Sequence, residues 1–155
     1  RALLNDLLER EVTRALRAER GFALLLFDLD GFKHVNDTWG HAAGDRLLAL
    51  VAERARGCMR ASDTVGRWGG DEFLAILPET TSEGALLVAE KLREAMLAPF
   101  PLGKHVATLG ASVGVSHFGE HGSDAQSLQR SADAALYEAK RLGKNRVFKA
   151  RAPAA

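Results

Sequence analysis

The sequence predicts an α+β fold in which helices surround one central, mostly antiparallel sheet. Two short strand-like runs flank Gly69-Gly70 as in a β-hairpin, and hairpins join antiparallel strands. The other strand-like runs are separated by long segments with helical periodicity, which can cover the faces of such a sheet. The chain has 155 residues, a length typical of one domain.

The first half of the chain is expected to supply three helices and one strand. Apolar residues recur at helical spacing in the first helix, and Gly21 should end it. The strand is an unbroken apolar run, which is typical of a strand buried on both faces of a sheet. The expected elements are a helix over 2–19 that buries Leu4, Leu7, Leu8, Val12 and Leu16, a strand over 22–27, a short helix over 32–38 closed by Gly40, and a helix over 42–59.

The second half is expected to complete the sheet and to add two helices. Gly69-Gly70 can adopt the positive φ of a tight hairpin turn, and Pro78 should end the second strand of the hairpin. Two Ser/Thr residues have the spacing of capping boxes. The expected elements are two strands around Gly69-Gly70, a helix over 82–97 capped by Thr80 and Glu83, two strands within 105–117, a helix capped by Ser123 and Gln126 that ends at Gly143, and a strand over 145–148.

The composition excludes several classes of protein. Lys and Arg number 21 against 20 Asp and Glu, and this near-zero balance argues against a dedicated nucleic-acid binder. Cys58 is the only cysteine, which excludes an internal disulfide and a cysteine-based zinc site. No apolar run is long enough to span a bilayer, and no secretory signal is visible. We therefore expect a soluble, cytoplasmic domain that binds no nucleic acid.

Several familiar enzyme motifs are absent from the chain or lack the structural context that they need. The chain has neither a P-loop nor a dinucleotide fingerprint, and its five histidines lack the spacing of zinc ligands. Gly110, Ser112 and Gly114 match the G-x-S-x-G elbow of serine hydrolases. That motif needs a helix directly after the turn, whereas the residues after Gly114 continue as a strand. A serine hydrolase is therefore not expected.

Four acidic residues follow or flank predicted strands. Asp28 and Asp30 come at the end of the buried strand, and Asp71 and Glu72 lie at the hairpin tip. Carboxylates are costly to bury unless they are paired or bind a cation, and Mg²⁺ takes one or two carboxylates together with phosphate oxygens. The pattern therefore favours a magnesium site. The alternative is that these acids are solvated turn residues, and this alternative is weakest for Asp28.

Five further residues are candidate partners of a nucleotide. Lys33, Lys140 and Lys144 could bind phosphate, although cations at the end of a helix are also favoured by the helix dipole alone. Asn36 and Asp45 could read the edge of a base. Asn and Asp also commonly fill turn and cap positions, and the pattern alone favours that interpretation.

With these residues in view, the chain resembles the diguanylate cyclase family. The resemblance rests on GGDEF at 69–73 and on four other segments in the family's order and spacing. These segments are FDLDGFKHVNDTWGHAAGD (27–45), RASDTVGRW directly before the GGDEF motif (60–68), SVGVS (112–116), and the pair formed by RSADAALYEAK (130–140) and GKNRV (143–147).

The resemblance implies a palm-like nucleotidyl cyclase fold with a ferredoxin-like core. It implies that residues 1–150 form the catalytic domain and that 151–155 are a flexible tail. Members of the family join two GTP molecules into cyclic di-GMP and release two pyrophosphates. Because the product has two equivalent bonds, two domains must face each other as a homodimer.

The resemblance also assigns roles to the residues of the expected metal site. Asp28, Asp71 and the Leu29 carbonyl would bind Mg²⁺ or Mn²⁺. Asp71 would in addition help to activate the attacking 3′-hydroxyl, and Glu72 would support the metal site. The substrate residues that it implies are Lys33, Lys140 and Lys144 for the triphosphate, the backbone N–H groups of Gly31 and Phe32 beside it, and Asn36 and Asp45 for guanine.

The resemblance further implies an inhibitory site for the product. Arg60 and Asp63 form an R-x-x-D motif at the family's usual offset before GGDEF, and an Arg can both stack on guanine and bond it bidentately. Two departures weaken the match to the family. Lys91 replaces an Arg that often completes this inhibitory site, and Lys144 replaces the Arg that the family usually has at this phosphate-binding position. The chain begins with Arg1, and we expect an N-terminal sensor or regulatory domain, with any membrane tether, to be missing from it.

Two other functions remain open at this stage. The first is a non-catalytic module that binds GTP or cyclic di-GMP and signals. Degenerate members of the family usually lose motif or metal residues, whereas the motif, Asp28 and Lys33 are all present here. The second is a cyclase that makes a mixed adenine and guanine product. Asp45 argues against it, because a carboxylate pairs poorly with the adenine edge.

Overall fold

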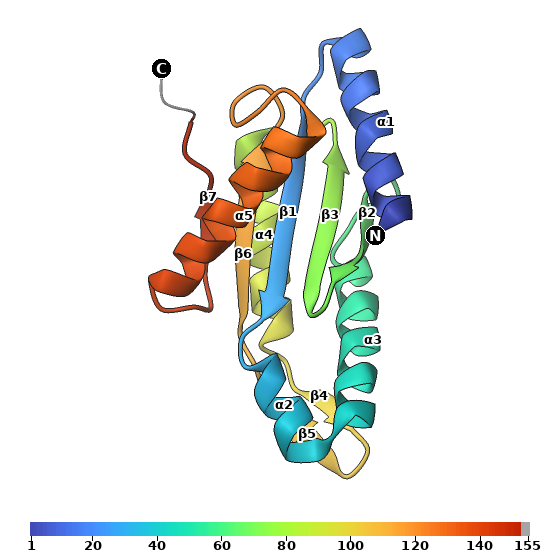
Figure 1. The fold of residues 1–155 in the computed structure, drawn as a ribbon, viewed down its shortest axis with the longest axis vertical. Helices are drawn as coiled ribbons and strands as arrows, with labels where there is room; N and C mark the ends of the chain where they lie inside the picture. Colours follow the sequence, from blue (N-terminus) through green and yellow to red (C-terminus); the bar gives the residue numbers. More distant parts are fainter. Residues whose placement is uncertain (153–155) are drawn as a thin grey trace.

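The protein has the predicted α+β architecture, a five-stranded sheet with helices on both faces (Figure 1). The computed structural model describes residues 1–152. The elements are α1 (Ala2–Ala18), β1 (Phe22–Leu29), α2 (Phe32–Trp39), α3 (His41–Gly57), β2 (Thr64–Gly69), β3 (Glu72–Pro78), α4 (Ser82–Met96), β4 (Phe100–Leu102), β5 (His105–Ala107), β6 (Ala111–His117), α5 (Ala125–Arg141) and β7 (Val147–Lys149). Among these residues, no helix has the length and apolar content needed to cross a membrane.

The order of the strands places β1 in the middle of the sheet. The order is β2-β3-β1-β6-β7, with antiparallel pairs throughout except for β6 and β7, which run parallel. β1 is buried along its whole length, as its apolar run predicts, and it extends two residues beyond the expected end to include Asp28. In this register Asp28 lies opposite Glu72 of β3 on one side and Ser112 of β6 on the other.

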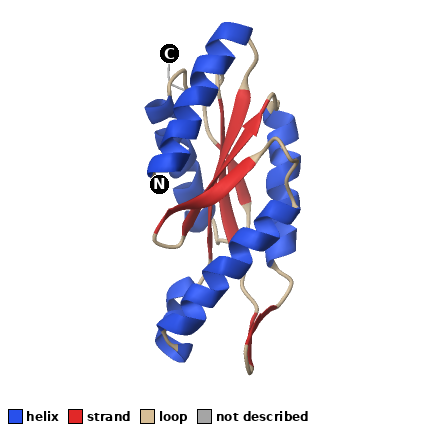
Figure 2. Cartoon of the chain, turned by 90° about the vertical axis from the view of Figure 1, so that its right-hand side faces the viewer, coloured by secondary structure: helices blue, strands red, loops and turns tan. Residues whose placement is uncertain are grey.

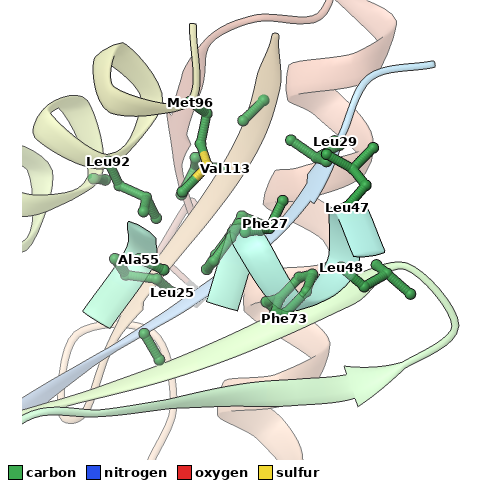
Figure 3. Close-up of a cluster of buried hydrophobic side chains, with 14 of the residues drawn as sticks. Leu25, Phe27, Leu29, Leu47, Leu48, Ala55, Phe73, Leu92, Met96 and Val113 are labelled. Carbon is green, nitrogen blue, oxygen red and sulfur yellow. The ribbon is translucent and has the colours of Figure 1, made fainter. Parts of the chain in front are cut away.

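Each face of the sheet packs against its own helices, so that the sheet lies between two helical layers (Figure 2). Leu25 and Phe27 point toward α3 and α4, where Phe27 stacks on Phe73 with ring centroids 5.3 Å apart (Figure 3). Leu24 and Leu26 point toward α1 and α5 on the other face. Because side chains alternate along a strand, Asp28 faces the same side as Leu26 and meets α5.

The segment between α4 and α5 differs from the prediction. It contains three strands instead of two, because β4 and β5 form a separate hairpin ahead of β6. This hairpin extends beyond the end of the main sheet (Figure 2). His105 of the hairpin stacks on Trp39 of α2, with ring centroids 4.7 Å apart. The expected strand in this region starts at residue 105, and only the tertiary pairing reveals that Phe100–Leu102 joins it.

Both predicted N-caps are displaced by one residue, and only the cap of α5 is a capping box. The N-cap of α4 is Thr81, whose hydroxyl accepts from the Gly84 N–H, and not Thr80. The N-cap of α5 is Asp124, which forms a capping box with Ser127, and not Ser123. In both places two residues that can cap a helix are adjacent in sequence, so spacing alone cannot choose between them.

The end of α1 also differs from the prediction. The helix ends at Glu19 in the left-handed conformation, two residues before the expected stop. Leu16 is 63% exposed, and Ala15 takes the buried position instead. Gly21 serves a different purpose, because a Cβ there would lie 2.7 Å from the ring of His117. The close approach of two segments therefore requires this glycine.

The chain remains packed against the sheet as far as Ala150. Ala150 is buried, and its N–H donates to the Val115 carbonyl at a distance of 2.7 Å. Of the expected flexible tail, 151–155, only residues 151 and 152 belong to the described part of the chain, and the other three lie outside it. Arg151 lies over the ring of Phe148, at 5.5 Å from its centroid.

The contact of β6 with α5 is testable at Gly114. A Cβ at this position would lie 2.3 Å from the Ala132 carbonyl oxygen and 2.5 Å from the Leu136 nitrogen, both in the backbone of α5. We expect Gly114→Ala to lower the free energy of unfolding by about 1–3 kcal/mol, because the helix must move off the sheet. Urea denaturation followed by circular dichroism measures this change.

The matched control is Gly57→Ala at the end of α3, where a new Cβ would meet nothing within 4 Å. We expect this substitution to leave stability unchanged or to raise it by up to about 1 kcal/mol, since Ala favours a helix over Gly. Equal effects of the two substitutions would contradict the close packing of α5 on Gly114.

Candidate active site

The predicted metal and phosphate residues gather at one end of the sheet. This end holds the end of β1, the β2–β3 turn, the start of α2 and the end of α5 (Figure 1). The structure thus brings together three segments that are far apart in the sequence.

Asp28 is the buried charge at this end. It is 3% exposed; its Oδ2 bonds to the Lys140 ammonium, and its Oδ1 has no hydrogen-bond partner within residues 1–152. Burial raises the pKa of Asp28 from 3.8 to about 6; Lys140 opposes this rise, and Asp71 and Asp30 add to it. A buried carboxylate oxygen without a partner is costly, and a cation would satisfy it.

Lys140 reaches Asp28 from the last turn of α5. Its side chain is 40% exposed. Burial lowers the pKa of Lys140, but the hydrogen bond and the charge of Asp28 outweigh burial and raise it overall. Pattern alone favoured a simple helix-end role for this lysine. The structure instead places its ammonium on the carboxylate at the end of β1.

The β2–β3 turn holds Asp71 and Glu72 beside Asp28. Gly70 has a φ of 51°, as the hairpin prediction requires, and its carbonyl accepts from Arg67 Nε at 2.7 Å. Glu72 is half-buried on the α5 face, and burial, together with the charge of Asp133, raises its pKa. The turn therefore adds two acids to the site, with Glu72 directly opposite Asp28.

Glu72 also lies near the first residue of the chain. Arg1 lies over the ring of Trp68, at 4.1 Å from its centroid, and its charge partly offsets the rise in the pKa of Glu72. Glu72, Asp133 and Arg1 line a cavity of about 290 Å³ between α1, α5 and the hairpin. Glu72 thus faces a different environment from the buried Asp28.

The loop after β1 leads directly into α2. Gly31, the N-cap of α2, has a φ of 84°, which a side chain would disfavour, and Phe32 begins the helix. Lys33 is exposed in the first turn. Because the first N–H groups of a helix lack partners within the helix, this end of α2 can receive an anion, with a lysine beside it.

Asn36 and Asp45 lie where α2 and α3 meet. The two helices touch at Gly44, where a Cβ would lie 1.8 Å from Asn36 Oδ1. The half-buried Asn36 amide therefore sits against the residue that precedes Asp45, which is exposed. Sequence reasoning missed Gly44; a glycine in the first turn of a helix, next to a candidate base-reading residue, was the available signal.

The end of α5 positions Lys144. Gly143 ends the helix with positive φ, as predicted, and the N–H groups of Gly143 and Lys144 bond to the carbonyls of Lys140 and Ala139. This is the Schellman arrangement of a helix C-terminus. Lys144 itself has a φ of 65° and is exposed. It follows the helix end that carries Lys140, and within residues 1–152 it forms no hydrogen bond or ion pair with Asp28.

Asp30 belongs with neither the metal candidates nor the solvated turn residues. Its Oδ1 accepts from the Ser112 hydroxyl at 2.7 Å, and its Oδ2 accepts from the Asn145 backbone N–H at 2.9 Å. Both oxygens are therefore occupied by protein donors. Ser112 was visible in the sequence as part of the rejected hydrolase motif, and Asn145 as part of GKNRV, but neither pattern indicated this contact.

The R-x-x-D residues form a compact ion pair at the C-terminal end of β3, away from Glu72 at the start of that strand. Arg60 Nη2 bonds to Asp63 Oδ1 at 2.8 Å, to the Pro78 carbonyl at 2.8 Å and to the Thr80 hydroxyl at 2.8 Å. The Asp63 side chain is 1% exposed, whereas the Arg60 side chain is 55% exposed. Lys91 is exposed on α4 and, in the described part of the chain, forms no hydrogen bond or ion pair with either residue.

The donor set fits a cation that takes most of its ligands from a nucleotide. Within residues 1–152 no three His, Cys, Asp or Glu side chains are grouped as a protein-only metal cage. Mg²⁺ is usually held by one or two carboxylates together with substrate phosphates. The unpartnered Asp28 Oδ1, with Asp71 close enough to raise the pKa of Asp28, provides such a set.

Comparison with known proteins now adds to this geometry. A family model described as "Diguanylate cyclase, GGDEF domain" matches residues 1–146. The chain belongs to the GGDEF domain family. This confirms the resemblance drawn from the sequence motifs, and the palm-like fold that the resemblance implies.

Individual relatives agree with the family match. The chain is 43% identical over 145 residues to the bifunctional diguanylate cyclase/cyclic di-GMP phosphodiesterase MucR of Pseudomonas aeruginosa, covering 94% of the GGDEF chain and 21% of MucR. The chain thus spans about a fifth of that relative's length.

Solved structures show the same fold. The crystal structure of the GGDEF domain of YfiN from Pseudomonas aeruginosa has a TM-score of 0.94 at 35% identity, covering 99% of this chain and 96% of that one. The GGDEF domain of DgcB from Caulobacter crescentus, in complex with c-di-GMP, has a TM-score of 0.89 at 29% identity, covering 96% and 89%.

The burial of Asp28 predicts an unusual dependence of stability on pH. Its pKa is about 6 in the folded chain against 3.8 for a free Asp side chain, so the folded state holds the proton more tightly. Ionisation of Asp28 therefore destabilises the fold as the pH rises from about 4 to about 6, by roughly 3 kcal/mol in total.

Urea denaturation of wild type and Asp28→Asn in EDTA, at pH values from 4.5 to 7.5, tests this dependence. Because Asn resembles the neutral acid, we expect Asp28→Asn to gain stability relative to wild type as the pH rises. Asp6→Asn, at an exposed position of α1, is the control and should follow wild type. A stability difference between wild type and Asp28→Asn that stays constant with pH would contradict the raised pKa.

Proposed function

We propose that this GGDEF domain is a diguanylate cyclase that joins two GTP molecules into cyclic di-GMP and releases two pyrophosphates. The observation that carries the proposal is the buried, half-partnered carboxylate of Asp28 beside Asp71 and Lys140. A protein whose purpose was only structural would gain stability by replacing such a group. The family description and the bound c-di-GMP of the DgcB relative support the same activity.

In this proposal Asp28, Asp71 and the Leu29 carbonyl hold Mg²⁺ or Mn²⁺. The bound cation would neutralise charge on the phosphates and lower the pKa of the attacking hydroxyl. Asp71 lies half-buried in the hairpin turn and accepts the proton of the 3′-hydroxyl as its oxygen attacks the α-phosphorus. The bond between the α-phosphorus and the leaving pyrophosphate breaks in the same displacement. Glu72 supports Asp28 from the opposite strand.

The triphosphate is held by cationic and backbone groups from two segments. The backbone N–H groups of Gly31 and Phe32, at the N-terminus of α2, can donate to phosphate oxygens. Lys33 adds a positive charge in the same turn. Lys140 and Lys144 approach from the end of α5. In the chain alone Lys140 balances Asp28, and it becomes available to phosphate oxygens once the charge of Asp28 is satisfied by a cation.

Guanine is read where α2 meets α3. Asn36 offers both a donor and an acceptor, and Asp45 can accept from the N1–H and the exocyclic amine of guanine. Gly44 holds these two residues close together, because any larger residue would displace the Asn36 amide. An adenine edge would meet an unpaired carboxylate, so GTP is the substrate in this proposal.

One domain presents one nucleotide, and the product has two equivalent bonds. We therefore propose that two copies of the GGDEF domain, residues 1–150, face each other across a two-fold axis. Each 3′-oxygen then attacks the nucleotide held by the partner. An N-terminal sensor or regulatory segment would control this encounter, as the chain spans only about a fifth of MucR.

The central experiment incubates the chain with GTP and Mg²⁺ and identifies the products by chromatography. We expect cyclic di-GMP and pyrophosphate from wild type and none from Asp71→Ala, whose circular dichroism should remain that of wild type. Asp6→Ala on α1 is the matched control and should keep full activity. Absence of product from wild type would instead favour the alternative, a module that only binds GTP or cyclic di-GMP.

The same assay also tests whether activity depends on a dimer and whether the site selects guanine. Activity that depends on a dimer should rise more steeply than linearly with protein concentration, whereas a strictly linear dependence would contradict it. A mixture of GTP and ATP should yield only cyclic di-GMP. A mixed adenine and guanine product would show that Asn36 and Asp45 do not select guanine.

Product inhibition is expected at Arg60 and Asp63. We propose that cyclic di-GMP binds there, because the Arg60 guanidinium is exposed while Asp63 is held in place beneath it. We expect added cyclic di-GMP to slow wild type and to leave Arg60→Ala at least about tenfold less sensitive. Lys91→Arg should tighten inhibition if this position completes the site, and equal inhibition of all three proteins would rule out this location.

A further inference from the structure

The geometry points to Asp30 as a positioning residue for phosphate binding. We propose that its carboxylate fixes the loop of residues 142–146, and through this loop sets where Lys144 stands relative to Asp28. The inference rests on the proposed function, in which Lys144 binds the triphosphate. It assigns Asp30 a task that involves no contact with the metal or the nucleotide.

The first support is that Asp30 is fully engaged by protein donors. Ser112, which is completely buried in β6, donates to Oδ1, and the Asn145 backbone N–H donates to Oδ2. The backbone N–H of Asp30 donates in turn to the Gly110 carbonyl at 2.8 Å. One carboxylate therefore ties the end of β1, the start of β6 and the loop after α5 to one another.

The second support is the conformation of the loop. Lys144 has a φ of 65° and Asn145 a φ of 46°, so two successive residues other than glycine are left-handed. This conformation is unfavourable for residues with a Cβ and persists only where the surroundings hold it. Asn tolerates this conformation better than most residues, so the strain falls mainly on Lys144. The hydrogen bond from the Asn145 N–H to Asp30 is made directly after the strained residue.

The other contacts of the loop hold its two ends but do not link it to β1. The Lys144 N–H bonds back to the Ala139 carbonyl of α5, and the Arg146 carbonyl accepts from Val113 of β6. Arg93 of α4 donates to Asn145 Oδ1 at 3.1 Å. Asp30 supplies the connection to the strand that carries Asp28, two residues earlier in the chain.

Gly110 makes this connection possible. A Cβ there would lie 3.0 Å from Asn145 Cβ and 3.1 Å from Asp30 Oδ2. The glycine thus allows the loop and the carboxylate to meet. Substitution of Gly110 gives a second way to disturb the same contact without changing any charge.

The experiment compares Asp30→Asn, Gly110→Ala, Lys144→Ala and the double variant Asp30→Asn/Lys144→Ala with wild type. Affinity is measured with Mg²⁺ and α,β-methylene GTP, whose bond to the leaving group cannot break. Hydrogen exchange of the Asn145 amide, measured without nucleotide, reports directly on its hydrogen bond to Asp30, here called the clamp. Asp6→Asn is the matched control for the change from acid to amide and should behave as wild type.

We expect Asp30→Asn and Gly110→Ala each to weaken binding of the analogue by about fivefold to tenfold and to speed exchange of the Asn145 amide. The double variant should bind no more weakly than Lys144→Ala, because without the lysine its placement no longer matters. Thermal unfolding of each variant identifies any that has lost its fold. If Asp30→Asn does not fold, Gly110→Ala still tests the same contact.

Two results would overturn the inference. Losses of affinity that multiply in the double variant would show that Asp30 acts independently of Lys144, either on the cation or through general stability. Unchanged exchange of the Asn145 amide in Asp30→Asn would show that the clamp does not exist in solution. A wild type that neither binds the analogue nor converts GTP would refute the proposed function. The exchange rate of the Asn145 amide would still show whether Asp30 holds the loop.

Discussion

The structure depends on one strand that is buried on both faces and ends in a carboxylate. Because β1 lies in the middle of the sheet, its register with β3 and β6 decides which residues stand beside Asp28. Two helical layers shield this position from water, and Lys140 bonds to only one of its oxygens. The arrangement costs stability in the isolated chain, and an interaction with a cation and a nucleotide would recover it.

Most of the fold follows from local patterns. The apolar run of β1, the glycine turn between β2 and β3 and the helical spacing of α3 and α5 each specify their element. The N-caps of α4 and α5 each lie one residue after the predicted one, although α4 begins at Ser82 as predicted. At α4 a distant contact decides the cap. The Thr80 hydroxyl accepts from Arg60 and donates to the Pro78 carbonyl, so Thr81 is the residue left to cap α4.

The site was predictable only as far as its residues are close in sequence or belong to a known motif. The pattern of the chain suggested four acids for a metal site and three lysines as candidate phosphate partners. The family resemblance then singled out Asp28 and Asp71 as ligands and favoured the phosphate role of the lysines. Which donors actually meet depends on how α5 packs across β1, because Lys140 and Asn145 lie more than a hundred residues from their acidic partners. No local spacing encodes these contacts, nor the packing of Asn36 on Gly44.

The parallel pairing of β7 with β6 has a consequence for how the domain is made. The end of α5 and the loop with Lys144 are held by a strand formed by some of the last residues of the chain. During synthesis the sheet can begin to assemble from β1 and β3, but Asp28 lacks Lys140, and Asp30 lacks Asn145, until this C-terminal segment has emerged. A chain released early would therefore contain the GGDEF hairpin without an assembled phosphate site.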